Sequence, residues 1–299
     1  MWLRFKEWAD EYGPIYQTQA LNQAFIIVSD EKIAEELLIK RGHIYSGRPQ
    51  IRSLFRHKEG PAYVALMDRH DIWTRQRKWA HAAMAEAYKH HFYGHIESET
   101  HRYLAMLLLD PAHFLDYTRE FCGRVMSRLA WDDATQGKAN GDSADCTLHC
   151  MSVSGPITNT MTPIWHLPFF INPWKKFEVQ REATQRAWWL NNYQLAKKRY
   201  LKGDLPSDTW GYQYFKQLQR EGNRTLEQDK DQETFASCMI GFLNLVGVVT
   251  ISGPLKFFLM AMALHLEWQK KAQDEVDRVC GDQMPTRKDF EECLLSGRV

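Results

Sequence analysis

A run of 21 residues, from Phe235 to Leu255, carries no charged side chain. At about 1.5 Å per residue, a helix of that length reaches roughly 30 Å, enough to cross the hydrocarbon core of a bilayer. The run also contains Asn244, Thr250, Pro254 and three glycines. These polar and helix-weakening residues favour the central helix of a large globular core, since a helix that is apolar on all sides can equally be buried in protein. We therefore predict a buried helix over about residues 232–264, with a membrane span as the alternative.

Gly247 and Thr250 are the residues of this run that best suit a ligand site. Gly247 has no Cβ and lets another group approach the helix backbone closely. Thr250 follows one turn later, and its hydroxyl can bond back to the carbonyl four residues earlier and bend the helix. The pair predicts the floor of a ligand or cofactor site. The alternative is a threonine bonded only to its own helix.

Helical patterns dominate the rest of the chain, so the predicted fold class is mainly α with a small β part. Two β-prone segments, 15–21 and 24–30, predict a hairpin. Residues 132–145 are rich in Asp, Gly and Asn and predict a polar loop. The predicted helices cover residues 1–12, 31–41 (capped by Ser29 or Asp30), 69–92, 94–109, 114–131, 145–160, 174–201, 208–220, 232–264 and 267–280.

Composition narrows the function classes. Lys plus Arg is 38 and Asp plus Glu is 37, so the net charge of +1 gives no electrostatic reason to expect a nucleic-acid partner. The six cysteines are unpatterned, which argues against a disulfide framework and for a reducing compartment. Cys146, His149 and Cys150 make a poor zinc site, and no metal site is predicted. The N-terminal segment lacks the pattern of a signal peptide.

A second candidate site lies on the predicted helix 69–92. Trp73 and Arg77 are four residues apart and share one helix face. An indole N–H and a planar guanidinium can both donate to one carboxylate, the guanidinium with two bonds. The alternative is a surface arginine that packs on a tryptophan.

Six segments carry a family resemblance, in order along the chain. They are YGPIYQ (12–17), IYSGRP (44–49), WTRQRKWAHAAM (73–84), SDTWGYQYF (207–215), VGVVTI (246–251) and MALHLEWQKKAQDEVDRVCGD (262–282). With these motifs the chain resembles a cytochrome P450, a haem-thiolate monooxygenase, of the fungal microsomal kind. Each motif is weak by itself, but the six stand in the family's order and at its usual separations.

The resemblance implies a single domain over residues 1–299, an incomplete cytochrome P450 fold built around the long central helix. It implies haem as cofactor, an apolar small-molecule substrate, NADPH–cytochrome P450 reductase as partner, and a role in fungal secondary-metabolite biosynthesis. Trp73 and Arg77 would meet a haem propionate. Gly247 would leave room for dioxygen, and Thr250 would help to deliver protons. Location on the cytosolic face of the endoplasmic reticulum membrane is also implied, and the aromatic, proline-rich stretch 162–174 would lie near the substrate entrance or the membrane surface, with a packed loop as the alternative.

The sequence departs from the family's motifs at some positions, and these departures leave two alternatives to a monooxygenase open. The acidic position before Thr250 is Val249, and none of the cysteines lies in the family's haem-ligand motif Phe-x-x-Gly-x-Arg-x-Cys-x-Gly. The chain also lacks the anchor helix of microsomal members. We therefore expect a monooxygenase-like protein without its N-terminal anchor and C-terminal haem-ligand region. The alternatives are a catalytically inactive, truncated remnant and a small membrane-spanning protein.

Overall fold

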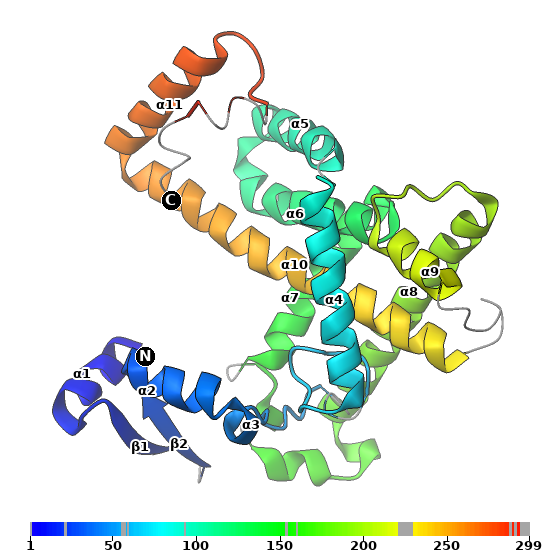
Figure 1. Ribbon diagram of the computed structural model, residues 1–299. Helices are drawn as coiled ribbons and strands as arrows, with labels where there is room; N and C mark the ends of the chain where they lie inside the picture. The colour runs from blue at the N-terminus through cyan, green and yellow to red at the C-terminus, as the bar shows by residue number, and fades with distance from the viewer. Residues whose placement is uncertain are drawn as a thin grey trace. The chain divides into compact units, whose positions relative to one another are not determined.

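The computed structural model of the 299-residue chain describes residues 2–20, 23–54, 58, 60–92, 94–152, 155–159, 161–220, 230–286, 289 and 292–293. Over these residues it is mainly helical with one two-stranded sheet (Figure 1), which confirms the predicted fold class. The main elements are α1 (Trp2–Tyr12), β1 (Ile15–Ala20), β2 (Gln23–Val28), α2 (Glu31–Ala34), the π-helical η1 (Glu35–Lys40), α3 (Gly42–Tyr45), α4 (Asp71–Lys89), α5 (Gly94–Leu109), α6 (Phe114–Trp131), α7 (Gly137–Met151), α8 (Pro173–Lys202), α9 (Trp210–Arg220), α10 (Lys230–Leu264) and α11 (Leu266–Cys280). Short 3-10 segments are η2 (Pro111–His113), η3 (Ala134–Gln136), η4 (Ile157–Asn159), η5 (Thr162–His166) and η6 (Phe169–Ile171).

The chain forms two compact units. The first contains residues 1–82, 147–191 and 230–239, and the second contains residues 83–146, 192–229 and 240–299. Four helices, α4, α7, α8 and α10, contribute residues to both units. The prediction of a single domain over the whole chain stays a prediction.

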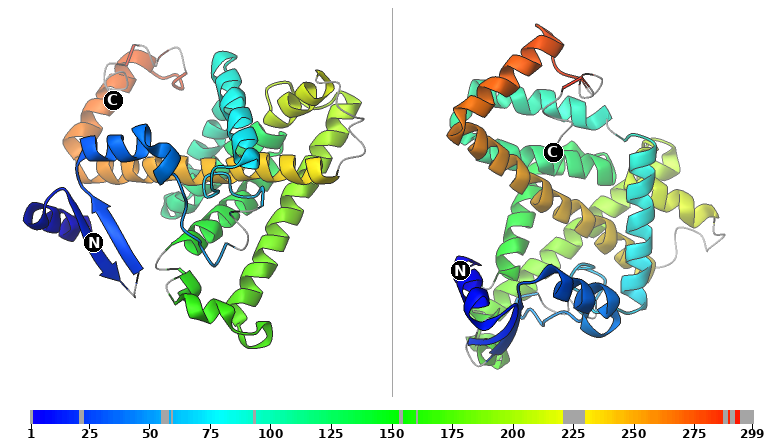
Figure 2. Two further views of the ribbon diagram at one scale, coloured as in Figure 1. Left: turned by 60° about the horizontal axis from the view of Figure 1, so that its bottom comes forward. Right: turned by 60° about the vertical axis from the view of Figure 1, so that its left-hand side comes forward.

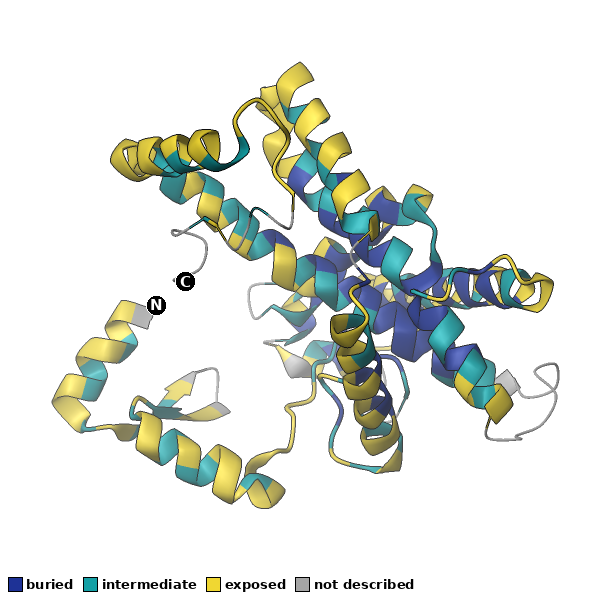
Figure 3. Ribbon diagram, turned by 45° about the horizontal axis from the view of Figure 1, so that its top comes forward, coloured by how far each residue is buried: buried dark blue, intermediate teal, exposed yellow. Residues whose placement is uncertain are grey.

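The first unit contains the predicted hairpin, which follows α1. β1 and β2 pair antiparallel, from Ile15 opposite Val28 to Ala20 opposite Gln23. The Tyr16 hydroxyl donates to the Phe5 carbonyl at 2.9 Å and so fastens α1 to the hairpin. No described side chain before residue 51 is buried, and α1 is coloured exposed and intermediate along its length in Figure 3. The core of this unit therefore comes from its later segments.

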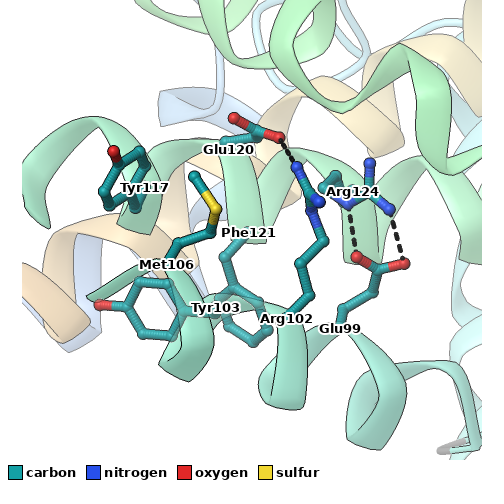
Figure 4. A pocket seen from close by; sticks show the side chains of 8 residues that line it. All are labelled: Glu99, Arg102, Tyr103, Met106, Tyr117, Glu120, Phe121 and Arg124. Carbon is teal, nitrogen blue, oxygen red and sulfur yellow. Dashed lines mark hydrogen bonds and ion pairs between the residues drawn. The ribbon is translucent and has the colours of Figure 1, made fainter. Parts of the chain in front are cut away.

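In the second unit, α5 and α6 lie side by side (Figure 1 and the right-hand view of Figure 2). Glu99 of α5 is 4% exposed and accepts hydrogen bonds from the guanidinium groups of Arg124 and Arg128 of α6. Figure 4 shows Glu99 and Arg124 beside a cavity of about 10 Å³ between the two helices. That volume holds one water at most. The contact is therefore a structural ion pair and not a ligand site.

The predicted polar loop over residues 132–145 is wrong, because α7 begins at Gly137. A Cβ on Gly123 of α6 would collide with the Gly137 carbonyl, so the two backbones meet at a distance that only glycine allows. Glycine costs a helix about 1 kcal/mol against alanine, and the close packing on α6 offsets that cost. The chain turns into this helix at Asp132, whose φ of 56° places it in the left-handed region. The bounds of the helix predicted over 145–160 are also wrong, because α7 begins earlier, at Gly137, and ends at Met151.

The apolar run lies within α10, which extends over 35 residues with Pro254 inside it. Among the described residues this is the one helix long and apolar enough to cross a membrane, and 56% of its most apolar window is buried inside the protein. Ile240 is fully buried and Leu245 is 1% exposed. That burial favours the predicted core helix over the membrane span.

We expect the substitution Glu99→Gln to destabilise the second unit by about 2 kcal/mol, because it leaves two guanidinium groups without a carboxylate. Urea denaturation measures the free energy of unfolding. Glu97→Gln is the matched control, since Glu97 lies on the exposed side of α5. Equal stability of both variants would contradict the importance of the ion pair.

Candidate functional site

Trp73 and Arg77 lie on the same face of α4, in the first unit. The guanidinium carbon of Arg77 is 5.3 Å from the centroid of the Trp73 ring, so the two side chains stack. Trp73 is half-buried and Arg77 is exposed. The shared face predicted from their spacing is therefore present.

The start of α4 is anchored to the segment before it. Gln76 is fully buried, and its side-chain amide donates to the Pro61 carbonyl at 2.7 Å. The imidazole of His70, just before the helix, lies 3.0 Å from the Lys58 carbonyl. These bonds hold the first turns of α4, which carry Trp73 and Arg77, against Lys58 and Pro61.

Arg77 has no carboxylate within ion-pair distance in the part of the chain that the structure describes, whereas Lys58 of the same unit pairs with Asp68 at 2.9 Å. The stacked indole keeps the guanidinium plane in one orientation and leaves its N–H groups as donors. An anionic group such as a carboxylate fits this pair. The expected role as a propionate partner agrees with this arrangement and stays a prediction.

Gly247 lies in the second unit, on α10. A Cβ built there would fall 3.1 Å from Met126 Cγ and closer still to the sulfur of Met126 on α6. A group does approach the helix closely at this glycine, and that group is a methionine side chain. This contact does not test whether Gly247 leaves room for dioxygen, and that role stays a prediction.

Thr250 is exposed, and its hydroxyl donates to the Val246 carbonyl at 3.1 Å. The Gly247 carbonyl lies 3.4 Å from the same hydroxyl. This is the back-bond that the sequence suggested. The structure thus brings together the members of each predicted pair, Trp73 with Arg77 in the first unit and Gly247 with Thr250 in the second.

A buried amide pair in the second unit was not predicted. Asn140 of α7 donates from Nδ2 to Asn244 Oδ1 of α10 at 2.6 Å, and both residues are fully buried. Asn140 Oδ1 and Asn244 Nδ2 have no other partner among the described residues. Asn244 was visible as an oddity in the apolar run. Its partner lies in the stretch whose composition suggested a loop, so no pattern in the sequence indicated the pair.

The environments of the cysteines show whether one of them could be the axial thiolate ligand of a haem. Burial raises the pKa of the Cys122 and Cys238 thiols to about 11, so both are protonated at neutral pH. The Cys150 thiol is fully buried and directed at the Glu178 carboxylate, 3.4 Å from each oxygen. Trp73 and Arg77 therefore fit the anionic edge of a haem, while an axial thiolate is not found among these cysteines.

We expect Gly247→Ala to destabilise the second unit by about 1 to 2 kcal/mol, because its methyl group displaces Met126 in a packed core. Gly253→Ala is the control on the same helix, where a Cβ meets nothing within 4 Å. That control should stabilise the helix by about 0.5 to 1 kcal/mol. Thermal unfolding of the two variants would contradict the close approach if both shifted in the same direction.

Comparison with known proteins is consistent along the whole chain. The family model described as Cytochrome P450 matches residues 1–295. The cytochrome P450 monooxygenase virE of Hypocrea virens is 24% identical over 295 residues, covering 96% of this chain and 52% of its own length. COX2, a cytochrome P450 monooxygenase of Coprinopsis cinerea, is 26% identical over 301 residues and is covered over 55% of its length. The chain thus spans about half the length of the curated relatives it matches.

The fold comparison agrees. A zebrafish cytochrome P450 solved with progesterone superposes with a TM-score of 0.72 at 16% identity, over 97% of this chain and 67% of the other. At that identity the superposition shows the fold alone. The family match extends over almost every residue, from the hairpin through α4 and α10 to α11, and on that ground the chain belongs to the cytochrome P450 family.

Proposed function

We propose that this chain carries the haem-propionate and oxygen-site segments of a monooxygenase that oxidises an apolar small molecule, with electrons from NADPH–cytochrome P450 reductase. The observation that carries the proposal is Arg77, an exposed cation stacked on Trp73 with no carboxylate partner among the described residues. The fungal relatives carry the name monooxygenase, which supports this class of reaction. A role in fungal secondary-metabolite biosynthesis is part of the proposal.

Each residue has a distinct task in this proposal. Haem, when bound, supplies the activation of dioxygen. Arg77 and the Trp73 indole N–H donate to one propionate and orient the cofactor. The Thr250 hydroxyl holds a proton at the site where oxygen reacts. In the structure this hydroxyl donates to the Val246 carbonyl at 3.1 Å. Val249, next to it, offers no titratable group.

A second candidate function is an inactive remnant that binds haem without activating oxygen. One observation favours it: none of the six cysteines lies in the family's ligand motif. In this family an axial cysteine thiolate would supply the electron density that oxygen activation by haem requires. The two candidates share the propionate pair and differ in the axial ligand.

We also propose peripheral contact with the cytosolic face of the endoplasmic reticulum membrane through the aromatic, proline-rich stretch of the first unit. Its apolar side chains are exposed: Leu167 40%, Phe169 51%, Phe170 86% and Ile171 52%. Trp165, by contrast, is 7% exposed and anchors the stretch. Adjacent exposed apolar side chains of this kind mark an interaction surface.

We expect Arg77→Leu to weaken haem binding by about 10-fold or more, because a charge-assisted hydrogen bond to the propionate is lost. Haem titration followed by the Soret band measures the affinity. Lys78→Leu, which removes a neighbouring exposed cation on α4, is the control and should change it less than about twofold. The same loss in both variants would refute a specific propionate contact.

We expect Phe170→Ser to lower binding to phosphatidylcholine vesicles about 10-fold, since transfer of one Phe side chain out of water contributes roughly 1.5 to 3 kcal/mol. Vesicle co-sedimentation gives the partition coefficient. Leu108→Ser, at another side chain that is 86% exposed but lies in the second unit, should have little effect. If the two substitutions weaken binding equally, the stretch is not the contact surface.

A further inference from the structure

The first unit contains a surface groove of about 560 Å³ at the start of α8. One wall is the segment Gly155–Ile157, and the other is Pro173, Trp174 and Phe177 from the first turns of the helix. His149 and Glu178 complete the lining. Pockets for small molecules have volumes of roughly 300 to 1,000 Å³, mostly apolar walls and a few polar groups.

The walls of the groove are apolar and partly in contact with water. Trp174 is 43% exposed, Phe177 is 58% exposed and Ile157 is 38% exposed. Trp174 and Phe177 are three residues apart on a helix, so their rings share one face. Pro156 and Pro173 hold the backbone of both walls in fixed conformations. An apolar molecule placed between the walls would remove this exposed surface from water at little cost in chain ordering.

Glu178 is the carboxylate among the residues that line the groove, and it is 1% exposed. One carboxylate oxygen accepts from Arg181 Nε at 2.9 Å, and the Cys150 thiol lies 3.4 Å from both oxygens. Arg181 is itself held by Gln185 Oε1 at 3.2 Å. A carboxylate has about four acceptor positions. These contacts keep Glu178 in place and occupy at most three of the four positions.

The charged residues in and near the groove indicate which kind of ligand it could bind. Among the described residues no lysine or arginine lines the groove, so these residues offer an anionic head group no counter-charge. Arg181 already balances Glu178, which leaves little attraction for a cation. A neutral hydrogen-bond donor such as a hydroxyl group satisfies the carboxylate without adding a buried charge.

We propose that this groove is a binding site for an apolar small molecule that carries a hydroxyl group, with the hydroxyl on Glu178 and the apolar body between Ile157 and the Trp174–Phe177 face. This inference rests on the proposed function. The proposed function requires an apolar small molecule, and the groove adds a hydroxyl group to the description of that molecule. It assigns a site outside the propionate and oxygen residues, since neither pair lines the groove.

The test uses the haem-free 299-residue chain and two isomeric probes. Octan-1-ol has a hydroxyl donor, and heptyl methyl ether has the same atoms without one. Titration calorimetry should show saturable binding of octan-1-ol at least about 10-fold tighter than that of the ether, the expected value of one hydrogen bond to a charged group. No saturable binding, or equal affinity for the two isomers, would overturn the proposal.

Matched variants locate the site. Phe177→Asp should weaken octan-1-ol binding at least about 10-fold, because it places a charge on the apolar wall. Phe170→Asp, at a side chain that is 86% exposed and does not line the groove, should leave the affinity within about twofold. Equal losses would show adsorption to exposed apolar surface and contradict a groove site. Haem titration of the same samples distinguishes failure of the groove proposal from failure of the proposed function. If the chain binds octan-1-ol but not haem, the result counts against the proposed function alone.

Discussion

The second unit depends on how α10 accommodates polar and small residues within its apolar sequence. A buried amide without a partner costs about 1 to 3 kcal/mol, so Asn244 is tolerable only because Asn140 of α7 meets it at 2.6 Å. Gly247, one turn later, is the point where Met126 of α6 approaches the helix. These two contacts fix the rotation of α10 relative to α6 and α7 and thereby the direction in which Thr250 is presented.

Much of this arrangement could be predicted because it is encoded locally. The hairpin, the limits of α5 and α6, and the stacking of Arg77 on Trp73 follow from residue type and spacing. The start of α7 could not, because its glycines and polar residues favour a loop and only the close packing of Gly123 on Gly137 makes a helix there. Contacts between distant parts of the chain leave no periodic signal, and the Asn140–Asn244 pair was missed for the same reason.

The candidate site also has a part that is encoded locally and a part that depends on contacts between distant residues. The members of each pair are one helical turn apart, so their partnership is a local property that a motif can reveal. What each pair meets is not local. Gly247 meets Met126, which no sequence pattern indicated, and Arg77 meets no carboxylate in the described part of the chain. The exposed cation is therefore the stronger indication of a ligand, since an unpaired guanidinium stacked on an indole is ready for an anion.

We propose that this chain of the cytochrome P450 family holds haem through Arg77 and Trp73, and that none of its six cysteines supplies an axial thiolate. The most direct measurement is the carbon monoxide difference spectrum of the reduced, haem-loaded chain. We expect bound haem whose Soret band lacks the shift that a thiolate ligand causes. A thiolate-type shift would show that one of the six cysteines ligates iron, and would contradict the assignment of all six as non-ligands.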